Sequence, residues 1–253
     1  MNVDKHLRRQ MFGLLLCCFL LILASACATR TYTWPFRRGE PVREVHGGGW
    51  WYAKFYINWP EDIQPFMYID LCLAHRVLLP VLREHKDNIS LWRVHRRAAR
   101  DQAGHRFGFI FYASPEVAEE IYADLQNNSL LAEMSHAGLI IDIAYDDTLV
   151  ITRPHIENTS DPNWSTTIQK SWPYFIMGVS QMWLASIAEI VEQEFPGYDP
   201  SSLDEMLTFY EHVDETLTSL WQEEGRHSLL HHLNAIFGYE PVRLNRGDIM
   251  FRF

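Results

Sequence analysis

Five arginines gather within a short stretch of an otherwise acidic chain. Residues 93–106 hold them with one acid, Asp101, a local net charge of +4 in a chain of formal net charge −10. Guanidinium groups bind carboxylates and phosphates through paired hydrogen bonds. Strands over 91–98 and 105–112 would align these side chains on one face of a hairpin, as an anion-binding row. The alternative is a solvated face, or arginines paired with acids of the same chain. The predicted row consists of Arg93, His95, Arg97 and Arg106.

A second candidate group lies near the C-terminus, where Glu224 and His227 have Glu-x-x-His spacing and His231 follows one turn later. Such spacing occurs in zinc and iron sites. No second Glu-x-x-His is expected on a facing helix, and His232 points about 100° away from His231 on a helix. We therefore expect no metal and no cofactor. His231 and His232 remain candidates for ligand binding beside the arginines.

The residues around both groups resemble the C-terminal domain of lantibiotic dehydratases and its stand-alone relatives in thiopeptide biosynthesis. The resemblance rests on an aromatic, arginine-bearing strand, a Gly-His turn and a Ser-Pro-Glu helix start over 92–116. It continues in a closing helix over 228–238 with His, Asn and a terminal Phe-Gly. Together these segments hold 36 of the 253 residues.

That resemblance implies a domain that eliminates glutamate from a glutamylated peptide. In it, arginines would hold the glutamyl carboxylates, and His231 or His232 would assist proton transfer. The chain departs from the family at Phe107, Phe109 and Ala235, where the family pattern has arginine. Glutamylation also uses charged transfer RNA, which is cytoplasmic, whereas this chain is expected to be exported. We interpret the resemblance as a shared fold with lost or redirected chemistry.

The N-terminus has the pattern of a bacterial secretory signal. Three basic residues precede an uncharged apolar run over 11–23, and small residues lead to Cys27. The run is short beside the roughly 20 residues that a bilayer span requires. The sequence Ala-Ser-Ala-Cys over 24–27 resembles the lipobox of bacterial lipoproteins, with alanine at the usual leucine position. We expect removal of residues 1–26 and acylation of Cys27. Ordinary secretion and an uncleaved anchor are the alternatives.

By the same resemblance, the lack of an acidic residue after Cys27 predicts an outer-membrane protein that faces the periplasm. Residues 27–49 lack apolar periodicity and read as a flexible tether. The charged side chains of residues 1–26 sum to +2, so their removal leaves a net charge of −12. This acidity disfavours nucleic acid as a partner. The expected partners are the membrane, through Cys27, and an anionic envelope ligand or a protein.

Cysteine usage agrees with this interpretation. Two of the four cysteines lie inside the predicted signal, which leaves Cys27 and Cys72. Cys72 lies within an apolar helical pattern, which is typical of a buried structural thiol rather than a nucleophile.

Apolar periodicity assigns residues 50–253 to a single α+β domain. Strands are expected near 51–58, 91–98, 105–112 and 139–145, with helices after the first and third strands. This order is the ferredoxin-like split βαβ plan, an antiparallel sheet within residues 50–150. A long C-terminal helical hairpin is expected to follow, formed by helices near 166–194 and 202–222 within a helical part over 164–237.

The sequence thus predicts a lipid-anchored envelope protein that acts as a non-catalytic binding module for an anionic ligand or partner. The alternative function is a lyase or hydrolase that uses His231 or His232 together with the arginines. The two differ in geometry, because an enzyme should bring the histidines to the arginine row in one pocket.

Overall fold

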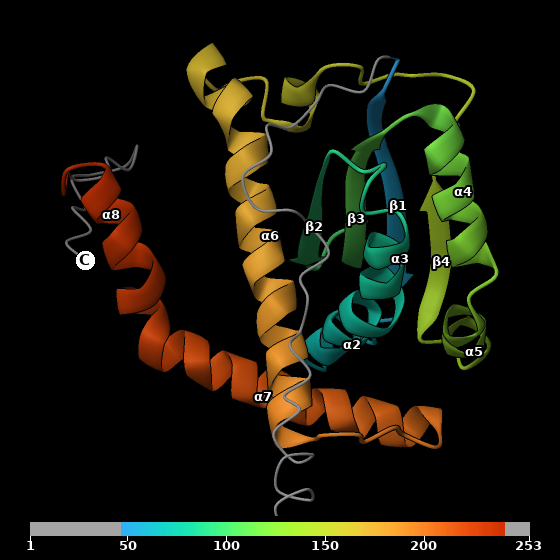
Figure 1. Cartoon of the computed structure of the whole chain (residues 1–253). Helices are drawn as coiled ribbons and strands as arrows, with labels where there is room; N and C mark the ends of the chain where they lie inside the picture. Colours follow the sequence, from blue (N-terminus) through green and yellow to red (C-terminus); the bar gives the residue numbers. More distant parts are fainter. Residues whose placement is uncertain (1–46, 241–253) are drawn as a thin grey trace, which may run out of the picture. The chain divides into compact units, whose positions relative to one another are not determined.

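The computed structural model describes residues 47–240. The predicted signal, Cys27, most of the tether and residues 241–253 lie outside this range, so the lipid anchor stays a prediction from sequence. The described part is α+β, with an antiparallel sheet followed by long helices (Figure 1). This confirms the predicted fold class.

Four antiparallel strands pair in the order β2-β3-β1-β4. With the alternation of strands and helices along the chain, this order is the ferredoxin-like plan that the sequence predicts. Each observed strand begins and ends within two residues of its predicted position. The strands are β1 (Gly49–Ile57), β2 (Leu91–Ala98), β3 (His105–Ala113) and β4 (Ile140–Tyr145).

Helices cover one face of this sheet. The covered face carries Phe107, Phe109 and Phe111 of β3, each fully buried. Tyr122 packs edge-on against Phe111 from α4, and Asp70 reaches the same face from α2. The helices of this layer are α2 (Met67–Cys72), the π-helix η1 (Leu73–Leu78), α3 (Leu79–Glu84), α4 (Pro115–Gln126) and α5 (Ser129–His136).

The start of α4 shows how local sequence fixes an element. The Ser114 hydroxyl accepts a hydrogen bond from the Val117 backbone N–H, and Pro115 occupies the first turn. Such a cap satisfies a donor that the helix itself cannot pair. A hydrogen bond from Ser114 lowers the pKa of Glu116, an acid at the positive end of the helix.

The long helix α6 (Thr166–Glu194) lies along the outer edge of β2 (Figure 1). Ser180 accepts a hydrogen bond from the backbone N–H of Val94, 3.2 Å away, which pairs a donor of the sheet edge. Two tryptophans of α6 stack on β2 arginines from opposite faces of the sheet. A helix in this place covers an edge that would otherwise present unpaired backbone groups.

A second long helix, α7 (Leu203–Gly225), packs chiefly against α2 rather than along α6. In Figure 1 it crosses the lower end of α6. The two helices form the long helical C-terminal part that the sequence predicts, and they cross each other. The direction of α7 follows from its apolar stripe, which packs on the helix layer of the sheet. Tyr210 of this stripe contacts His75 of η1. The chain continues through the π-helix η3 (Arg226–His231) into α8 (His232–Ile236), and we call these two segments the arm.

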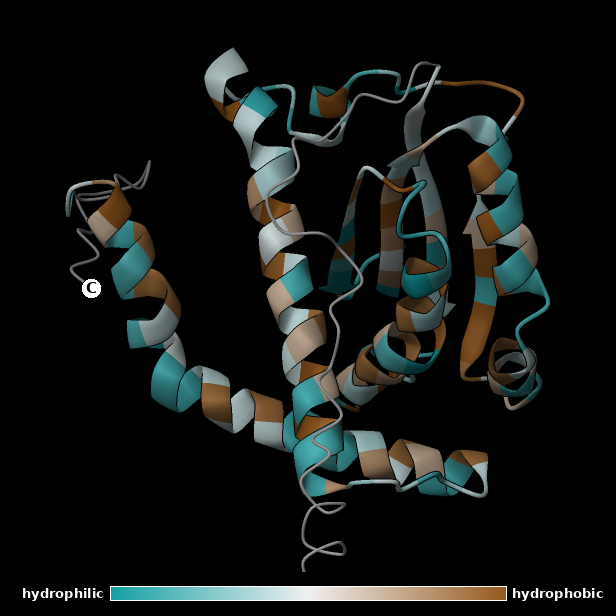
Figure 2. Cartoon of the chain, in the orientation of Figure 1, coloured by the Kyte–Doolittle hydropathy of each residue, from teal (hydrophilic) through white to brown (hydrophobic). Residues whose placement is uncertain are grey.

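Among residues 47–240, α6 is long and apolar enough to cross a membrane by length and composition. Its best window has a mean hydropathy of 1.4, and 28% of that window is buried. Core helices of soluble proteins pass the same test, so the finding is weak evidence for a span. Figure 2 shows hydrophobic residues on α6 interrupted by polar ones.

Candidate anion-binding face of the sheet

The four residues of the predicted row share the sheet face opposite the helix layer. Arg97 stands directly across from Arg106, His95 from Gly108, and Arg93 from Ile110. Opposed residues of antiparallel strands project to the same side, with Cβ atoms about 5 Å apart. The structure therefore brings the row together. Its role in ligand binding stays a prediction.

Strand β1 adds three residues to this face that sequence reasoning did not assign to the site. Lys54 pairs with Gly108, and Tyr56 pairs with Arg106. Tyr52 comes one step further along the strand and pairs with Ile110. A line across three strands thus runs Lys54, Gly108, His95. We call this group the basic face, and it comprises Tyr52, Lys54, Tyr56, Arg93, His95, Arg97, Arg106 and Gly108.

Gly108 lies buried between Lys54 and His95. A Cβ atom built at Gly108 would meet only the backbone oxygen of His95 at 3.6 Å and its Cβ at 3.7 Å. Both are ordinary van der Waals contacts. Crowding therefore does not require a glycine between these two basic side chains.

The arginines of the row are not equally free. Arg97 forms an ion pair with Asp101 of the hairpin loop. Arg93 donates from Nε to Thr159 Oγ1 at 3.1 Å and lies over the Trp172 ring, 5.0 Å from its centroid. These contacts tie both arginines to their own protein. The competing interpretation, arginines paired within the chain, is thus correct for Arg97.

Arg106 differs from these two. Its guanidinium lies 5.8 Å from the centroid of the Tyr56 ring, and no carboxylate within residues 47–240 pairs with it. Lys54 similarly approaches an aromatic ring, that of Tyr52, at 5.2 Å. The free positive charge of the basic face is therefore concentrated on β1 and β3 beside Gly108.

His95 reports the electrostatic potential of this face. The residue reaches the surface, but part of its ring is covered by neighbours. This partial burial lowers the pKa of His95, and the charges of Arg93, Arg106 and Arg97 lower it further. A histidine loses basicity when nearby positive charge disfavours its protonated form. Three arginines thus surround His95, while the exposed Asp142 of β4 stands across from Tyr56 on the same face.

The two candidate histidines lie elsewhere. His231 and His232 belong to the arm, whose contacts are chiefly with α7. Their rings group with that of His227, with centroids 5.2 to 5.5 Å apart. Within residues 47–240 no group of His, Cys, Asp or Glu has the geometry to hold a metal ion. The structure does not bring these histidines to the arginine row.

A buried ionic group on the helix-covered face was not foreseen. Asp70 is fully buried, with Arg96 Nε 2.8 Å from one carboxylate oxygen and His105 Nε2 3.0 Å from the other. Arg96 and His105 both belong to the basic stretch of the sequence, but they point away from the basic face. The contacts attach α2 to strands β2 and β3. The sequence signal for this ionic group was Asp70 itself, a charged residue within an otherwise apolar helical stretch.

Cys72 is fully buried, as predicted, and burial raises the pKa of its thiol to about 12. A thiol with such a pKa is not a nucleophile near neutral pH. The chain matches no known protein-family model, and neither curated proteins nor solved structures show significant similarity to it. Function has to be inferred from the geometry of the chain itself.

Proposed function

We propose that this chain is a lipid-anchored cell-envelope protein that binds an anionic ligand on the basic face without catalysing a reaction. One observation carries the proposal: Arg106 and Lys54 lie on neighbouring strands of the basic face and have no described carboxylate partner. A row of positive groups across a sheet suits a ligand with two or more carboxylates or phosphates.

The cellular part of the proposal comes from the signal pattern. Acylation at Cys27 would hold the domain at the membrane surface, and the tether over 27–49 would let it reach ligands in the envelope. Anionic peptidoglycan fragments meet both requirements, because they carry carboxylates and lie within reach of such a protein.

The alternative function, a lyase or hydrolase with His231 or His232, has no comparable support. Such chemistry needs a histidine within hydrogen-bond reach of the group that it serves. Both histidines belong to the arm, and the arginines to the sheet. Cys72 is buried and offers no substitute nucleophile.

The test is calorimetric titration of the full chain, in neutral detergent, with soluble muropeptides. Arg106→Gln should weaken binding about tenfold or more, since a charge-assisted hydrogen bond contributes about 1.5 to 3 kcal/mol. Gly108→Val should also weaken binding, because its side chain would separate Lys54 from His95 while the strand tolerates it. Lys86→Gln, an exposed lysine outside the basic face, is the matched control. Equal affinity in Arg106→Gln and wild type would refute the proposal.

A further inference from the structure

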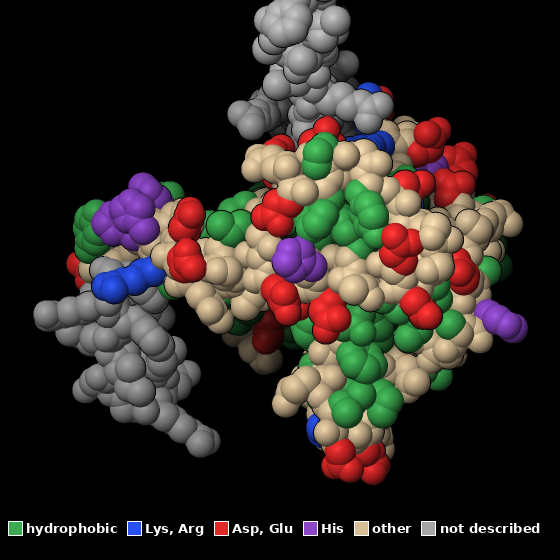
Figure 3. Space-filling model, turned by 90° about the horizontal axis from the view of Figure 1, so that it is seen from below, with side chains coloured by type: hydrophobic (Ala, Val, Ile, Leu, Met, Phe, Trp, Pro, Cys, Tyr) green, Lys and Arg blue, Asp and Glu red, His purple; other side chains and the backbone are tan. Residues whose placement is uncertain are grey.

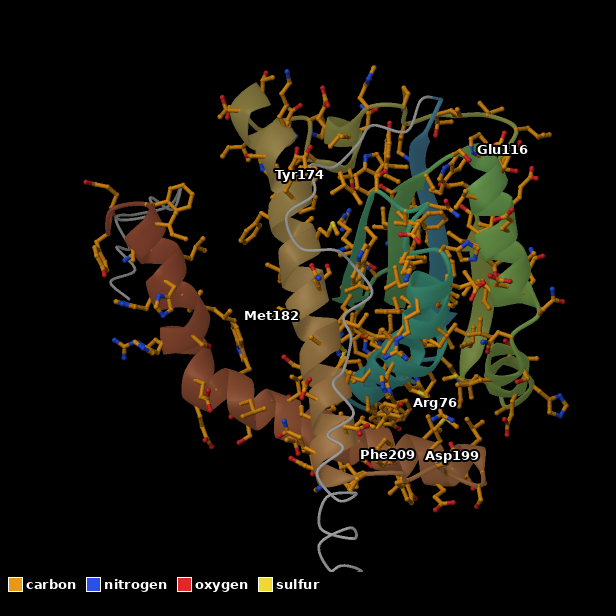
Figure 4. The ribbon with its side chains drawn as sticks, viewed as in Figure 1. Arg76, Glu116, Tyr174, Met182, Asp199 and Phe209 are labelled. Carbon is orange, nitrogen blue, oxygen red and sulfur yellow. The ribbon has the colours of Figure 1, made fainter. Side chains whose placement is uncertain are left out.

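A pocket of about 570 Å³ lies between α6 and the C-terminal half of α7, where α7 passes into the arm. Small-molecule sites usually enclose about 300 to 1,000 Å³. Figure 4 shows Met182 on the side of α6 that faces the arm, and this residue lines the pocket. The walls are largely apolar and include the half-buried Trp183 and the exposed Trp221. The pocket is separate from the basic face, because its β2 contact, Arg96, projects from the opposite side of the sheet.

The positive charge in the pocket is already compensated. Arg96 donates from Nε to Asp70 at 2.8 Å and from Nη2 to the backbone oxygen of Met67 at 3.0 Å. Its guanidinium also lies over the Trp183 ring, 4.9 Å from the centroid. Asp70 is fully buried and neutralises this charge from behind the wall. An anionic ligand would therefore find little net attraction here.

The negative charge in the pocket is not compensated in the same way. Asp214 lines the wall half-buried, and within residues 47–240 no hydrogen bond or ion pair engages its carboxylate. Glu224 lies nearer the C-terminal end of α7 and also lines the pocket. Figure 3 shows the molecule from below, where acidic and hydrophobic side chains interleave with few basic ones on the side of α7 that faces away from the pocket.

The surroundings of Asp214 disfavour its charged form. Burial raises its pKa first; Arg96 acts to lower it, and Asp70 and Glu215 act to raise it further. A cation placed beside the carboxylate would stabilise its charged form, which burial disfavours. Aromatic faces attract organic cations by the same electrostatics. Arg96 already lies over the Trp183 ring, so the Trp221 ring is the one that a ligand cation would use.

We infer that this pocket binds a small organic cation, an ammonium group carrying an aromatic or short aliphatic substituent. Asp214 would accept hydrogen bonds from the ammonium group, and the two tryptophans would enclose the substituent. A neutral ligand would gain only apolar burial. A metal ion would find two carboxylates on largely apolar walls, and no metal-binding group is present within the described residues.

The experiment compares three ligands of one size: benzylammonium, benzyl alcohol and benzoate. Each is titrated into the full chain in neutral detergent while tryptophan fluorescence is recorded. We expect benzylammonium to bind about tenfold or more tightly than benzyl alcohol, and benzoate to bind weakest. Asp214→Asn should abolish the preference for the cation over the alcohol and leave alcohol binding unchanged. Glu223→Gln, a carboxylate of α7 outside the pocket lining, is the matched control.

Two further results decide the inference. Asp214→Glu keeps the charge and should keep the preference for benzylammonium over benzyl alcohol. This variant shows whether a loss of binding in Asp214→Asn comes from the lost charge or from misfolding. Equal binding of the three ligands by wild type would overturn the inference. Nα-acetyl-lysine methylamide carries the same ammonium group on a protein side chain, and tighter binding of this probe than of benzylammonium would overturn the assignment to a free small molecule. None of these results depends on anion binding at the basic face.

Discussion

At the scale of single residues, the acid that matters most for stability is Asp70. It is fully buried and contacts both Arg96 and His105. Asp70→Ala would remove the partner of the buried His105 ring and of Arg96, whose side chain is 25% exposed, at a cost of about 3 kcal/mol of unfolding free energy. Denaturant unfolding should show this loss. Asp101→Ala, at the exposed Arg97 ion pair, should change stability little. Similar midpoints for the two variants would mean that the Asp70 group is not a structural clamp.

His95 gives a second residue-scale prediction, on binding rather than stability. Arg93, Arg97, Arg106 and partial burial lower its pKa in the free protein. A bound anion favours the protonated form, so it raises this pKa, and affinity should increase as pH falls through the range between the bound and free values. Muropeptide titrations at several pH values check this. His95→Gln should flatten the pH dependence, and a profile that keeps its slope in the variant would contradict the prediction.

At the scale of elements, the contact between η1 and α7 should make folding pH-dependent. His75 lies against the Tyr210 hydroxyl at 2.6 Å, and burial lowers its pKa from 6.5 to about 4. Because the unfolded chain binds the proton more tightly, stability is present above about pH 6.5 and is lost as pH falls towards 4. We expect a loss of about 2 kcal/mol between pH 7 and pH 5. Denaturant unfolding of His75→Gln should remove this part of the slope.

The attachment of α6 to the sheet edge can be tested with one matched pair. Ser180 donates to the Ile176 carbonyl and accepts from the Val94 N–H, whereas Ser171 makes only contacts within its own helix. Ser180→Ala should cost about 1 to 3 kcal/mol because it leaves a half-buried backbone donor unpaired. Ser171→Ala should cost much less. Thermal or denaturant unfolding distinguishes the two, and equal losses would show that the contact with β2 contributes nothing.

The elements were largely predictable, and the site only in part. Period-two alternation placed β2 and β3 to within two residues, and the Ser114 cap marked the start of α4. Lys54 was missed because its nearness to Gly108 depends on β1 pairing with β3, a contact between segments far apart in sequence. The crossing of α6 and α7 was missed for a similar reason. Periodicity shows which stripe of a helix is apolar, but not which neighbour covers it.

At the scale of the whole molecule, the anchor decides where the domain works. We expect Cys27→Ser to lose labelled palmitate and to leave the membrane fraction, because a thioether-linked lipid needs the cysteine sulfur. Cys72→Ser is the control, since its thiol is buried. A Cys27→Ser protein that still incorporates palmitate and still sediments with membranes would refute the lipoprotein assignment.

The position of α6 also limits how copies of this chain can assemble. With β2 covered, strand-to-strand pairing within residues 47–240 can occur only at β4, whose outer side has no neighbouring strand. A sheet that can extend from one side joins a single second copy around a two-fold axis and then has no edge left. Fibrils require both sides of every sheet to accept a neighbour. Self-association by this route would therefore stop at an eight-stranded pair.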